Sequence, residues 1–253
     1  MFYKLKKRQF IIVIPARMKS VRLPGKPLIN INGVPMVVRT YKQCLKVIDN
    51  SLIYVATDSL KIKKTCEKYG AQVIITSKKC LTGTDRVAEV ARKIKSKIYI
   101  NVQGDEPIFN PRDLKKLIQY GLKNSKAIIS GYCRINEERM YNDFNVPKVV
   151  LDKKNYLMYA SRAPIPSNKK AKFITANRQI CAYSFPKETL KIFSSYKKKA
   201  YLEGIEDIEY LRFLEIGIKV KCIKMSGKSL AIDNRYDLNA VIKIIKKNEK
   251  DYE

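Results

Sequence analysis

The amino-acid sequence predicts an α/β protein in which helices cover both faces of a mostly parallel sheet. Short apolar runs alternate with segments of helical periodicity through the first half of the chain, which is the pattern of a parallel sheet buried on both faces. After about residue 126, strand-like segments follow one another with few helices between them, so a smaller antiparallel part is expected there. With 253 residues, 45% of them hydrophobic, the chain is long enough to bury a full core without disulfides.

Strands alternate with helices in the first half. Continuous apolar runs predict strands at residues 10–14, 52–56, 72–75 and 98–102. Apolar residues at helical spacing predict helices at residues 35–48, 60–69, 86–94 and 113–122. Because parallel strands need crossover connections that are usually helices, this alternation predicts one parallel sheet.

The second half is predicted to be richer in strands. Apolar and β-branched segments predict strands at residues 127–134, 147–151, 156–161 and 179–185, with a hairpin turn at residues 152–155. Helical periodicity returns at residues 203–214 and 236–247. The sequence contains neither an internal repeat nor a low-complexity linker, so we expect one continuous domain over residues 1–253 with an antiparallel insertion.

The balance of charge is strongly positive. The chain has 52 Lys and Arg residues against 23 Asp and Glu residues, a formal net charge of +29. Most of the excess is lysine, placed singly or in short runs, whereas nucleic-acid readers usually cluster arginine with aromatic residues. Abundant Ile, Asn and Tyr beside Lys are typical of an A/T-rich genome. The charge therefore favours anionic ligands such as nucleotides and acidic sugars, and nucleic-acid binding is the alternative class of function.

Histidine is absent from the chain, which excludes Ser–His and Cys–His triads and any histidine general base. No two of the six cysteines are spaced as Cys-x-x-Cys, so they are expected to be buried free thiols in a reducing compartment, the cytoplasm. No apolar run approaches the ~18 residues of a membrane span, and no membrane partner is expected. Catalysis must therefore use carboxylates, Lys, Arg, Tyr or metal ions.

The first candidate site is the loop at residues 15–27, directly after the first predicted strand. Open α/β sheets bind ligands at the carboxyl ends of their strands. Backbone N–H groups of this loop are expected to cradle phosphates, and Arg17 and Lys26 to neutralise them. The loop matches neither the Walker A pattern nor Gly-x-Gly-x-x-Gly. A basic surface loop without a ligand is the alternative.

The second candidate site is the segment at residues 101–107, after the strand predicted at residues 98–102. Asp105 follows Gly104 there, a suitable position for a carboxylate that holds Mg²⁺ together with substrate phosphates. The alternative is a helix-entry turn capped by Asp105. If the two loops face each other across one sheet edge, they form the geometry of nucleotidyl transfer, with cations on the outer phosphates and a metal at the α-phosphate.

Residues 15–28 closely resemble the signature loop of the CMP-Kdo synthetases, or 3-deoxy-manno-octulosonate cytidylyltransferases, which reads Pro-Ala-Arg-x-x-Ser-Thr-Arg-Leu-Pro-Gly-Lys-Pro-Leu. Only Val21 departs from its fixed positions. The resemblance continues, in the family's order and over nearly the whole chain, through residues 31–36, 55–58, 82–86, 101–107, 147–152 and 159–166.

This resemblance implies a cytoplasmic, homodimeric enzyme with a nucleotide-binding fold of the glycosyltransferase-A or Rossmann-like type. It implies a reaction in which CTP and a 3-deoxy-2-ulosonic acid give a CMP-sugar and pyrophosphate, with Mg²⁺, for lipopolysaccharide or capsule synthesis. It further implies that residues 1–126 mainly bind CTP, residues 127–234 mainly bind the sugar and form the dimer, and residues 235–253 form a C-terminal helix.

The family's motifs also imply roles for individual residues. Arg17, Lys26, Asp105 and Asp233 would be catalytic, and Asp105 and Asp233 would be the metal ligands. CTP would be bound by residues of the first loop and of two later segments: Pro15, Ala16, Arg17, Ser20, Arg22, Lys26, Thr76, Thr82, Gly83, Thr84 and Arg86. The sugar acid would be bound by residues of the second half and one from the metal loop: Gln103, Arg162, Gln179, Tyr183, Glu203 and Glu206.

The chain departs from the family pattern mainly in the acceptor half. Gln179 stands where a histidine is usual, Tyr210 stands where a glutamine is usual, and Asn234 and Arg235 follow Asp233 in place of Thr-Pro. Histidine can carry a positive charge, whereas glutamine is neutral, and Tyr210 is expected to place an apolar face near the acceptor. Kdo is the expected acceptor, and an 8-amino relative of Kdo or a nonulosonic acid is the alternative.

Overall fold

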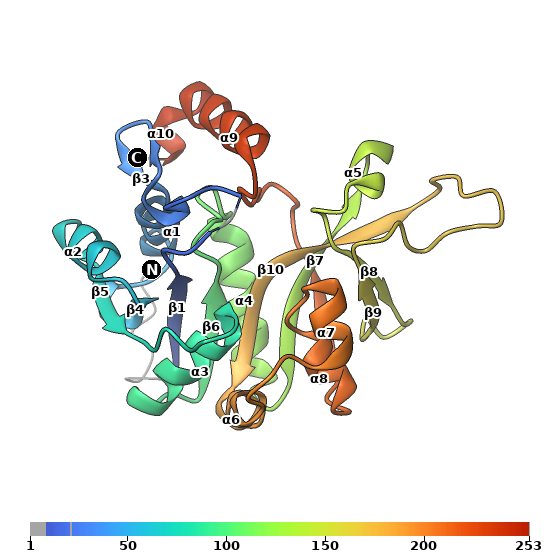
Figure 1. The fold of residues 1–253 in the computed structure, drawn as a ribbon, viewed down its shortest axis with the longest axis horizontal. Coiled ribbons are helices and arrows are strands. Elements are labelled where there is room, and N and C mark those ends of the chain that lie inside the picture. Colours follow the sequence, from blue (N-terminus) through green and yellow to red (C-terminus); the bar gives the residue numbers. More distant parts are fainter. Residues whose placement is uncertain (1–8, 21, 253) are drawn as a thin grey trace.

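The computed structural model describes residues 9–20 and 22–252, so Val21, the departure within the signature loop, lies outside the described residues. Within this part of the chain, the strands form one nine-stranded sheet and one short hairpin (Figure 1). The main path of the sheet runs β11-β7-β10-β6-β1-β4-β5, and β8 pairs with both β10 and β9. The predicted fold class, a mostly parallel sheet with helices on both faces and a smaller antiparallel part, is confirmed.

The parallel part is built from strands of the first half. They are β1 (Phe10–Ala16), β4 (Ile53–Thr57), β5 (Gln72–Ile75) and β6 (Ile98–Val102). β1 pairs in parallel with β4 on one side and β6 on the other, and all seven of its residues are buried. β1 is therefore a central strand, as its unbroken apolar sequence predicts.

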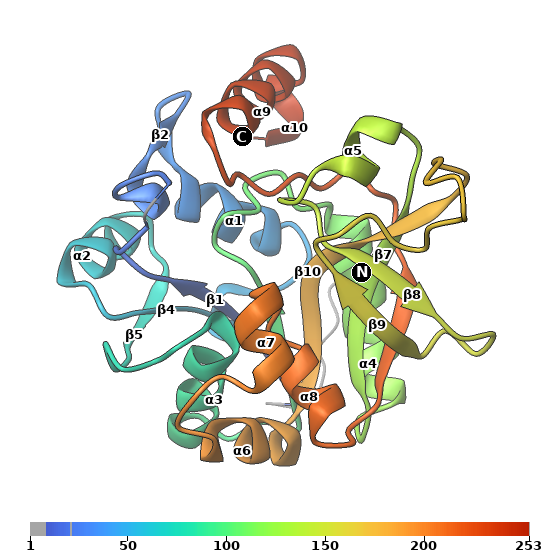
Figure 2. The same ribbon diagram turned by 45° about the vertical axis from the view of Figure 1, so that its right-hand side comes forward.

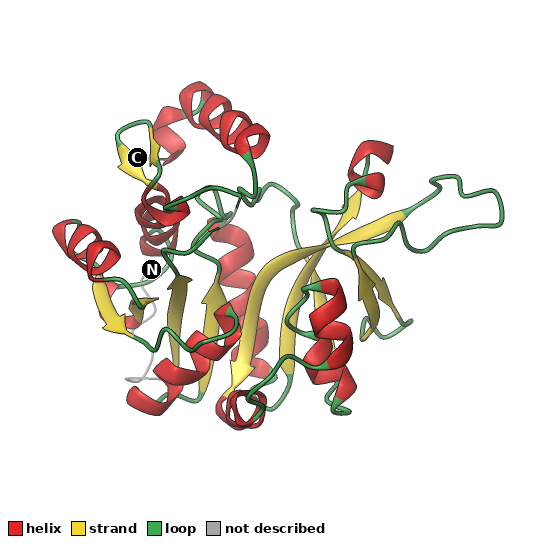
Figure 3. Ribbon diagram, in the orientation of Figure 1, coloured by secondary structure: helices red, strands yellow, loops and turns green. Residues whose placement is uncertain are grey.

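Helices cover both faces of this sheet, as Figure 3 shows. One face carries α1 (Met36–Leu45), α2 (Leu60–Lys68) and α4 (Pro111–Lys123). The opposite face carries α3 (Gly83–Lys93), α6 (Lys187–Ser195) and α8 (Leu211–Glu215). The starts of α2, α3 and α4 are fixed by side-chain caps from Ser59, Thr82 and Asn110, which satisfy N–H groups that the first helical turn leaves unbonded.

Strands of the second half complete the same sheet. β7 (Ile128–Ile135) and β11 (Val220–Lys224) pair in parallel, and β10 (Ala176–Pro186) joins β7 to β6 in antiparallel fashion. β8 (Lys148–Leu151) and β9 (Leu157–Ser161) form a hairpin beside the first part of β10 (Figure 2). Residue 126 therefore does not mark a boundary between two sheets, because β6 and β10 are hydrogen-bonded neighbours.

The second half also departs from prediction in its helices. The helix expected at residues 203–214 is two helices, α7 (Tyr201–Glu206) and α8, separated at Asp207, whose φ of 50° is left-handed and ends α7. Neither α6 nor β11 was predicted from the sequence. The described part of the chain also contains three short helical segments: the helix α5 (Glu138–Asn142) and the 3-10 turns η1 (Lys26–Leu28) and η2 (Asn50–Leu52).

The C-terminal helices pack beside elements of the first half of the chain. α9 (Arg235–Lys247) and α10 (Glu249–Tyr252) lie beside α1 and the hairpin of β2 (Asn30–Ile31) and β3 (Val34–Pro35). Leu238, Val241 and Ile245 of α9 form one apolar cluster with Leu23 and Ile31. This cluster holds α9 against the loop that follows β1. In the described part of the chain, no helix is long and apolar enough to cross a membrane.

Candidate active site

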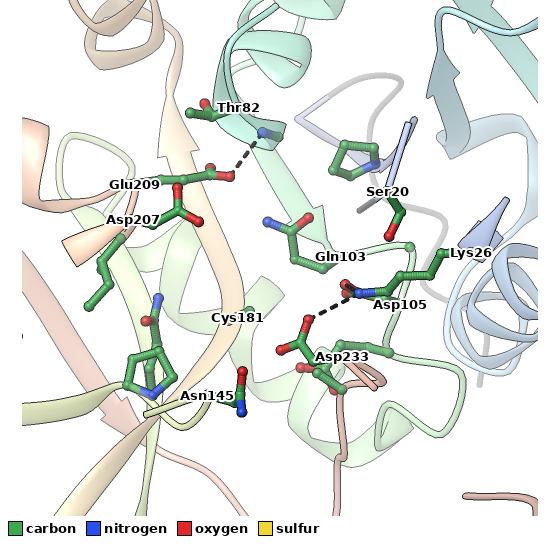
Figure 4. A pocket seen from close by; sticks show the side chains of 18 of the residues that line it. Ser20, Lys26, Thr82, Gln103, Asp105, Asn145, Cys181, Asp207, Glu209 and Asp233 are labelled. Carbon is green, nitrogen blue, oxygen red and sulfur yellow. Dashed lines mark hydrogen bonds and ion pairs between the residues drawn. The ribbon is translucent and has the colours of Figure 1, made fainter. Parts of the chain in front are cut away.

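A cavity of about 770 Å³ opens where β1 and β6 end. The loops after these two strands form one wall, and β10 with residues 207–209 forms the facing wall (Figure 4). Ligands are expected at this edge, because the carboxyl ends of parallel strands meet there. The cavity lining includes 15 of the predicted site residues: Pro15, Ala16, Arg17, Ser20, Arg22, Lys26, Thr82, Gly83, Arg86, Gln103, Asp105, Arg162, Gln179, Tyr183 and Asp233.

Lys26 lies between the two predicted metal ligands. Its Nζ is 2.6 Å from Asp105 Oδ2 and 3.1 Å from Asp233 Oδ1. Burial lowers the pKa of Lys26, but attraction by Asp105 and Asp233 outweighs it, and the pKa is raised above its ordinary value. The ammonium group is therefore charged across the range in which enzymes work.

Local backbone contacts bring these three residues together although they are far apart in sequence. Gly25, just before Lys26, has φ 67°, a left-handed conformation that glycine adopts without strain. The Ile232 N–H donates to the Asp105 carbonyl at 3.0 Å, which ties the segment of Asp233 to the loop after β6. Asn234 then caps α9.

Arg22 joins the same cluster from the exposed side. Its guanidinium donates to Asp233 Oδ1 at 2.9 Å and to Asn145 Oδ1 at 2.6 Å. The first loop is thereby linked to the segment before β8, across the mouth of the cavity. Asn145 was not predicted as a site residue, since nothing in its sequence surroundings marks it.

The N-terminus of α3 contributes to the cavity wall, but the N–H groups of its first turn already have a hydrogen-bond acceptor. Glu209 accepts from the N–H groups of Gly83 and Thr84, each at 2.9 Å, and from the Thr84 hydroxyl at 2.5 Å. Thr84 therefore faces Glu209 and does not line the cavity. Figure 4 shows Glu209 beside Thr82, with Gln103 between this side and the Asp105 side.

Arg86 lines the cavity with its side chain almost fully buried. It donates to Asp58 at 3.1 Å and also to the Thr76 hydroxyl. Thr76 is 4% exposed and lies behind Arg86, so the structure does not place it on the cavity wall. Its contact is with the arginine, whose orientation it helps to fix.

Gln179, Cys181 and Tyr183 of β10 line the facing wall of the cavity. The pairing of β10 with β7 is irregular between Ile180 and Tyr183, a bulge that turns this stretch toward the cavity. The Gln179 amide N–H donates to the Tyr183 hydroxyl. Burial, followed by nearby carboxylates, raises the pKa of Cys181 well above its ordinary value, so its thiol stays neutral.

Arg162 lines this side as predicted, but its N–H groups already have partners. They donate to the carbonyls of Glu206 at 2.6 Å, Phe144 at 2.9 Å and Asp207 at 3.1 Å. The Glu206 carboxylate accepts from the Ser161 hydroxyl at 2.6 Å and from the Arg162 backbone N–H at 2.8 Å. Glu206 therefore supports the backbone of Arg162 and does not line the cavity.

Glu203 and Tyr210, expected near the acceptor, are both in the core. Glu203 is fully buried and forms a two-point ion pair with Arg212, each N–O distance being 2.6 Å. Tyr210 is 1% exposed and does not line the cavity. These two positions lie within the acceptor motif along the sequence, but their side chains point away from the space that a ligand can enter.

Several further charged residues of the cavity lining were not predicted from the sequence, among them Glu106, Arg178 and Lys199. Glu106, next to Asp105, is 3% exposed, and burial, followed by repulsion from Asp105, raises its pKa to about 8. The Arg178 guanidinium donates to the carbonyls of Gly227 and Ser229, each at 3.0 Å. Lys199 Nζ lies 2.5 Å from Asp207 Oδ1. The sequence did contain a signal for Glu106, because this residue lies within the candidate segment at residues 101–107.

The donor set at Asp105 and Asp233 fits a magnesium ion that also binds a nucleotide. Both carboxylates point at one position, where Lys26 Nζ lies, and their side chains are 32% and 25% exposed. No cluster of three or more His, Cys, Asp or Glu side chains that would hold a metal occurs among the described residues. Two carboxylates, completed by phosphate oxygens and water, are a usual set for Mg²⁺.

Known proteins resemble this chain over most of its length. Residues 11–223 match a family model described as cytidylyltransferase. The 3-deoxy-manno-octulosonate cytidylyltransferase of Chloroherpeton thalassium is 38% identical over 248 residues, covering 95% of this chain and 99% of that protein. The Escherichia coli enzyme of the same name is 33% identical over 224 residues, covering 88% and 90%.

Solved structures give the same result. A CMP:2-keto-3-deoxy-manno-octonic acid synthetase complexed with CTP superposes with a TM-score of 0.85 at 30% identity, covering 95% of this chain and 99% of that one. A cytidylyltransferase from Leptospira borgpetersenii, with a TM-score of 0.61 at 16% identity, shares the fold. The chain therefore belongs to the cytidylyltransferase family, among the 3-deoxy-manno-octulosonate cytidylyltransferases.

Proposed function

We propose that this protein transfers a cytidylyl group from CTP to 3-deoxy-manno-octulosonate (Kdo) and releases pyrophosphate. The single observation that carries the proposal is the placement of Lys26 between Asp105 and Asp233 at the carboxyl ends of β1 and β6. The names of its relatives along nearly the full chain support the choice of nucleotide and acceptor. The product would be the activated sugar used in lipopolysaccharide or capsule synthesis.

The reaction joins the anomeric hydroxyl oxygen of the sugar acid to the α-phosphorus of CTP. The bond between that phosphorus and the bridging oxygen breaks, pyrophosphate leaves, and the hydroxyl proton passes to solvent. Both partners are anions, so the barrier includes charge repulsion. Arg17, Arg22 and Lys26 are positioned to offset this repulsion, since all three line the cavity on the side of the first loop.

Asp105 and Asp233 would hold Mg²⁺, which would supply positive charge at the α-phosphate and lower the pKa of a bound hydroxyl. The remaining work falls to the protein's own side chains. Lys26, held charged by its two carboxylates, can bind a phosphate oxygen, and Gln103 lies between the two walls (Figure 4). Gln179, Tyr183 and Arg162 would orient the sugar acid from the opposite side.

The test is pyrophosphate release from CTP with a panel of sugar acids. Kdo, its 8-amino relative and a nonulosonic acid are compared at equal concentration with Mg²⁺ present and with EDTA in its place. Rapid release with Kdo that EDTA abolishes is the expected result. Release only with another acid would keep the chemistry and change the acceptor, whereas no release with any acid would overturn the proposal.

We further propose that the protein is a cytoplasmic homodimer. Support for a dimer comes from apolar side chains that are exposed in the second half, namely Phe144 (64%), Met158 (62%) and Ile174 (73%), since exposed apolar groups commonly mark protein contacts. All six cysteines are free thiols, in keeping with a reducing compartment. Light scattering at micromolar protein tests the dimer, and a monomer in moderate salt would contradict it.

A further inference from the structure

Tyr210 lies directly behind the acceptor wall. Its ring meets the ring of Tyr183 edge-on, with centroids 6.0 Å apart and an interplanar angle of 83°. Tyr183 lines the cavity, whereas Tyr210 does not. Edge-to-face aromatic pairs fix the orientation of both rings, because the positive edge of one meets the negative face of the other.

Several contacts set the position of Tyr183. Besides Tyr210, its ring stacks on Phe185 with centroids 5.3 Å apart, and its hydroxyl accepts from Gln179. Phe185 belongs to the same strand as Tyr183, so it moves with that strand. Tyr210 is the ring contact that comes from a different element, the N-terminus of α8.

Residues on both sides of Tyr210 contact the first turn of α3 through their side chains. On one side, Glu209 accepts from the N–H groups of Gly83 and Thr84 at 2.9 Å. On the other side, the Arg212 guanidinium lies 3.3 Å from Asp85 Oδ1 and is fully buried. The residues that flank Tyr210 are therefore bound to residues 83–85, and Thr82 and Arg86, next to these residues, line the cavity.

We propose that Tyr210 is a positioning residue that ties Tyr183 of the acceptor wall to the N-terminus of α3. This inference rests on the proposed function, since it assigns Tyr183 to the sugar acid. The ring of Tyr210 carries the effect. Its hydroxyl is buried and has no hydrogen-bond partner among the described residues, so the hydroxyl contributes nothing that a phenylalanine would lack.

This assignment predicts a pattern of variants that simple loss of stability would not produce. Tyr210→Leu, which removes the ring edge, should raise the KM for the sugar acid at least fivefold while the affinity for CTP, measured by calorimetry, stays within twofold. Tyr210→Phe should keep both values at the wild-type level. The control is Phe10→Leu, a buried ring in the core on the opposite face of the sheet, which should lower the melting temperature without changing the KM for the sugar acid.

A double variant tests whether the effect passes through Tyr183. In a Tyr183→Leu background, adding Tyr210→Leu should leave the kinetic constants unchanged, because coupled residues are not additive. The ring of Tyr183 is also followed without turnover. In protein labelled with ¹³C on the tyrosine rings, the Tyr183 signal, assigned with Tyr183→Phe, should show faster ring flips in Tyr210→Leu and the wild-type flip rate in Tyr210→Phe and Phe10→Leu.

Three results would overturn the inference: an unchanged ring-flip rate of Tyr183 in Tyr210→Leu, an equal rise in the KM for the sugar acid in Phe10→Leu, or an equal rise in that KM in Tyr210→Phe. Failure of the proposed function is distinguished by the wild type. If wild-type protein releases pyrophosphate with no acid of the panel, the proposed function is wrong. The ¹³C signal then still decides whether Tyr210 positions Tyr183.

Discussion

Lys26 Nζ lies 2.6 Å from Asp105 Oδ2, and the two residues come from loops that follow different strands of the parallel sheet. One is the expected phosphate ligand and the other the expected metal ligand. Their ion pair, with Asp233 as a third member at 3.1 Å, holds the two loops together before any substrate binds. Such preorganisation reduces the reorganisation that the transition state requires.

Loss of either carboxylate should abolish turnover. Asp105→Asn and Asp233→Asn each remove a negative charge that Mg²⁺ needs, and both side chains are partly exposed, so the fold should persist. We expect a fall of more than tenfold in the rate of pyrophosphate release, or over about 1.4 kcal/mol in the barrier. Asp152→Asn, in the exposed turn between β8 and β9, is the matched control. A variant that keeps more than about a tenth of the rate shows that its residue is not a metal ligand.

Removing the cations of the first loop should weaken the use of CTP. Lys26→Ala and Arg17→Ala each delete a charged donor on the cavity wall, and a hydrogen bond to a charged group is worth about 1.5–3 kcal/mol. The KM for CTP should therefore rise roughly 10- to 150-fold, while Lys68→Ala on α2 leaves it unchanged. Unchanged CTP affinity in both loop variants would place the phosphates elsewhere in the cavity.

The parallel half of the fold could be predicted from sequence because its strands are unbroken apolar runs. β1, β4 and β6 are buried along nearly their whole length, so each appears as a continuous hydrophobic segment. β11 and α6 were missed because tertiary contacts define them: β11 has polar residues at Lys221 and Lys224 and pairs with a strand some 90 residues earlier. The break between α7 and α8 depends on one left-handed residue, Asp207, for which the sequence carries no glycine signal.

A motif match predicted a site residue correctly only where the side chain of that residue also faces the cavity. Loop residues such as Arg17, Lys26 and Asp105 line the cavity, because the loops that carry them follow the carboxyl ends of β1 and β6. Thr84 and Glu203 lie inside matching motifs, but each is bound to a partner outside its own helix, Glu209 and Arg212 respectively. The position of a residue within a sequence motif predicts where its backbone lies, but it does not predict the direction of its side chain.

The ion pair of Glu203 with Arg212 should matter for stability and not for acceptor binding. Both side chains are fully buried, and Glu203→Gln leaves the Arg212 charge with Asp85 alone. Breaking a buried pair in this way costs roughly 3–5 kcal/mol, so the melting temperature should fall by on the order of 10 °C. The double variant Glu203→Gln/Arg212→Met should recover part of that loss. An unchanged melting temperature together with a tenfold rise in the KM for the sugar acid would contradict this prediction and would indicate that Glu203 contacts the substrate.

Lys148 should make stability depend on pH in the alkaline range. It is buried between the carbonyls of Asp143 and Arg162, and burial lowers its pKa from 10.5 to about 8. Between these two values the unfolded chain binds more protons than the folded chain, so this residue makes stability rise with pH from about 8 to 10.5. Urea unfolding should show the free energy of wild type minus that of Lys148→Met growing across this interval. Buried thiols and phenols titrate there too, but they are common to both proteins. A constant difference would contradict the assignment.

Replacing Gln179 with histidine should introduce a pH dependence that the wild type lacks. Gln179 lines the cavity and uses its N–H on the Tyr183 hydroxyl, and an imidazole N–H can make the same donation. The chain has no other histidine, so the new imidazole, with an ordinary pKa near 6.5, adds a titration of its own. Below that pH it adds a positive charge to the acceptor wall, where the anionic sugar acid is proposed to bind.

The kcat/KM for the sugar acid in Gln179→His, divided by that of wild type, should therefore rise severalfold from pH 8 to pH 6. Dividing by the wild type removes the titration of CTP itself. Gln179→Asn, which is neutral throughout, is the control, and its ratio should stay flat. A flat ratio in Gln179→His as well would mean that residue 179 does not face the acid, and the acceptor would then have to bind nearer Arg162.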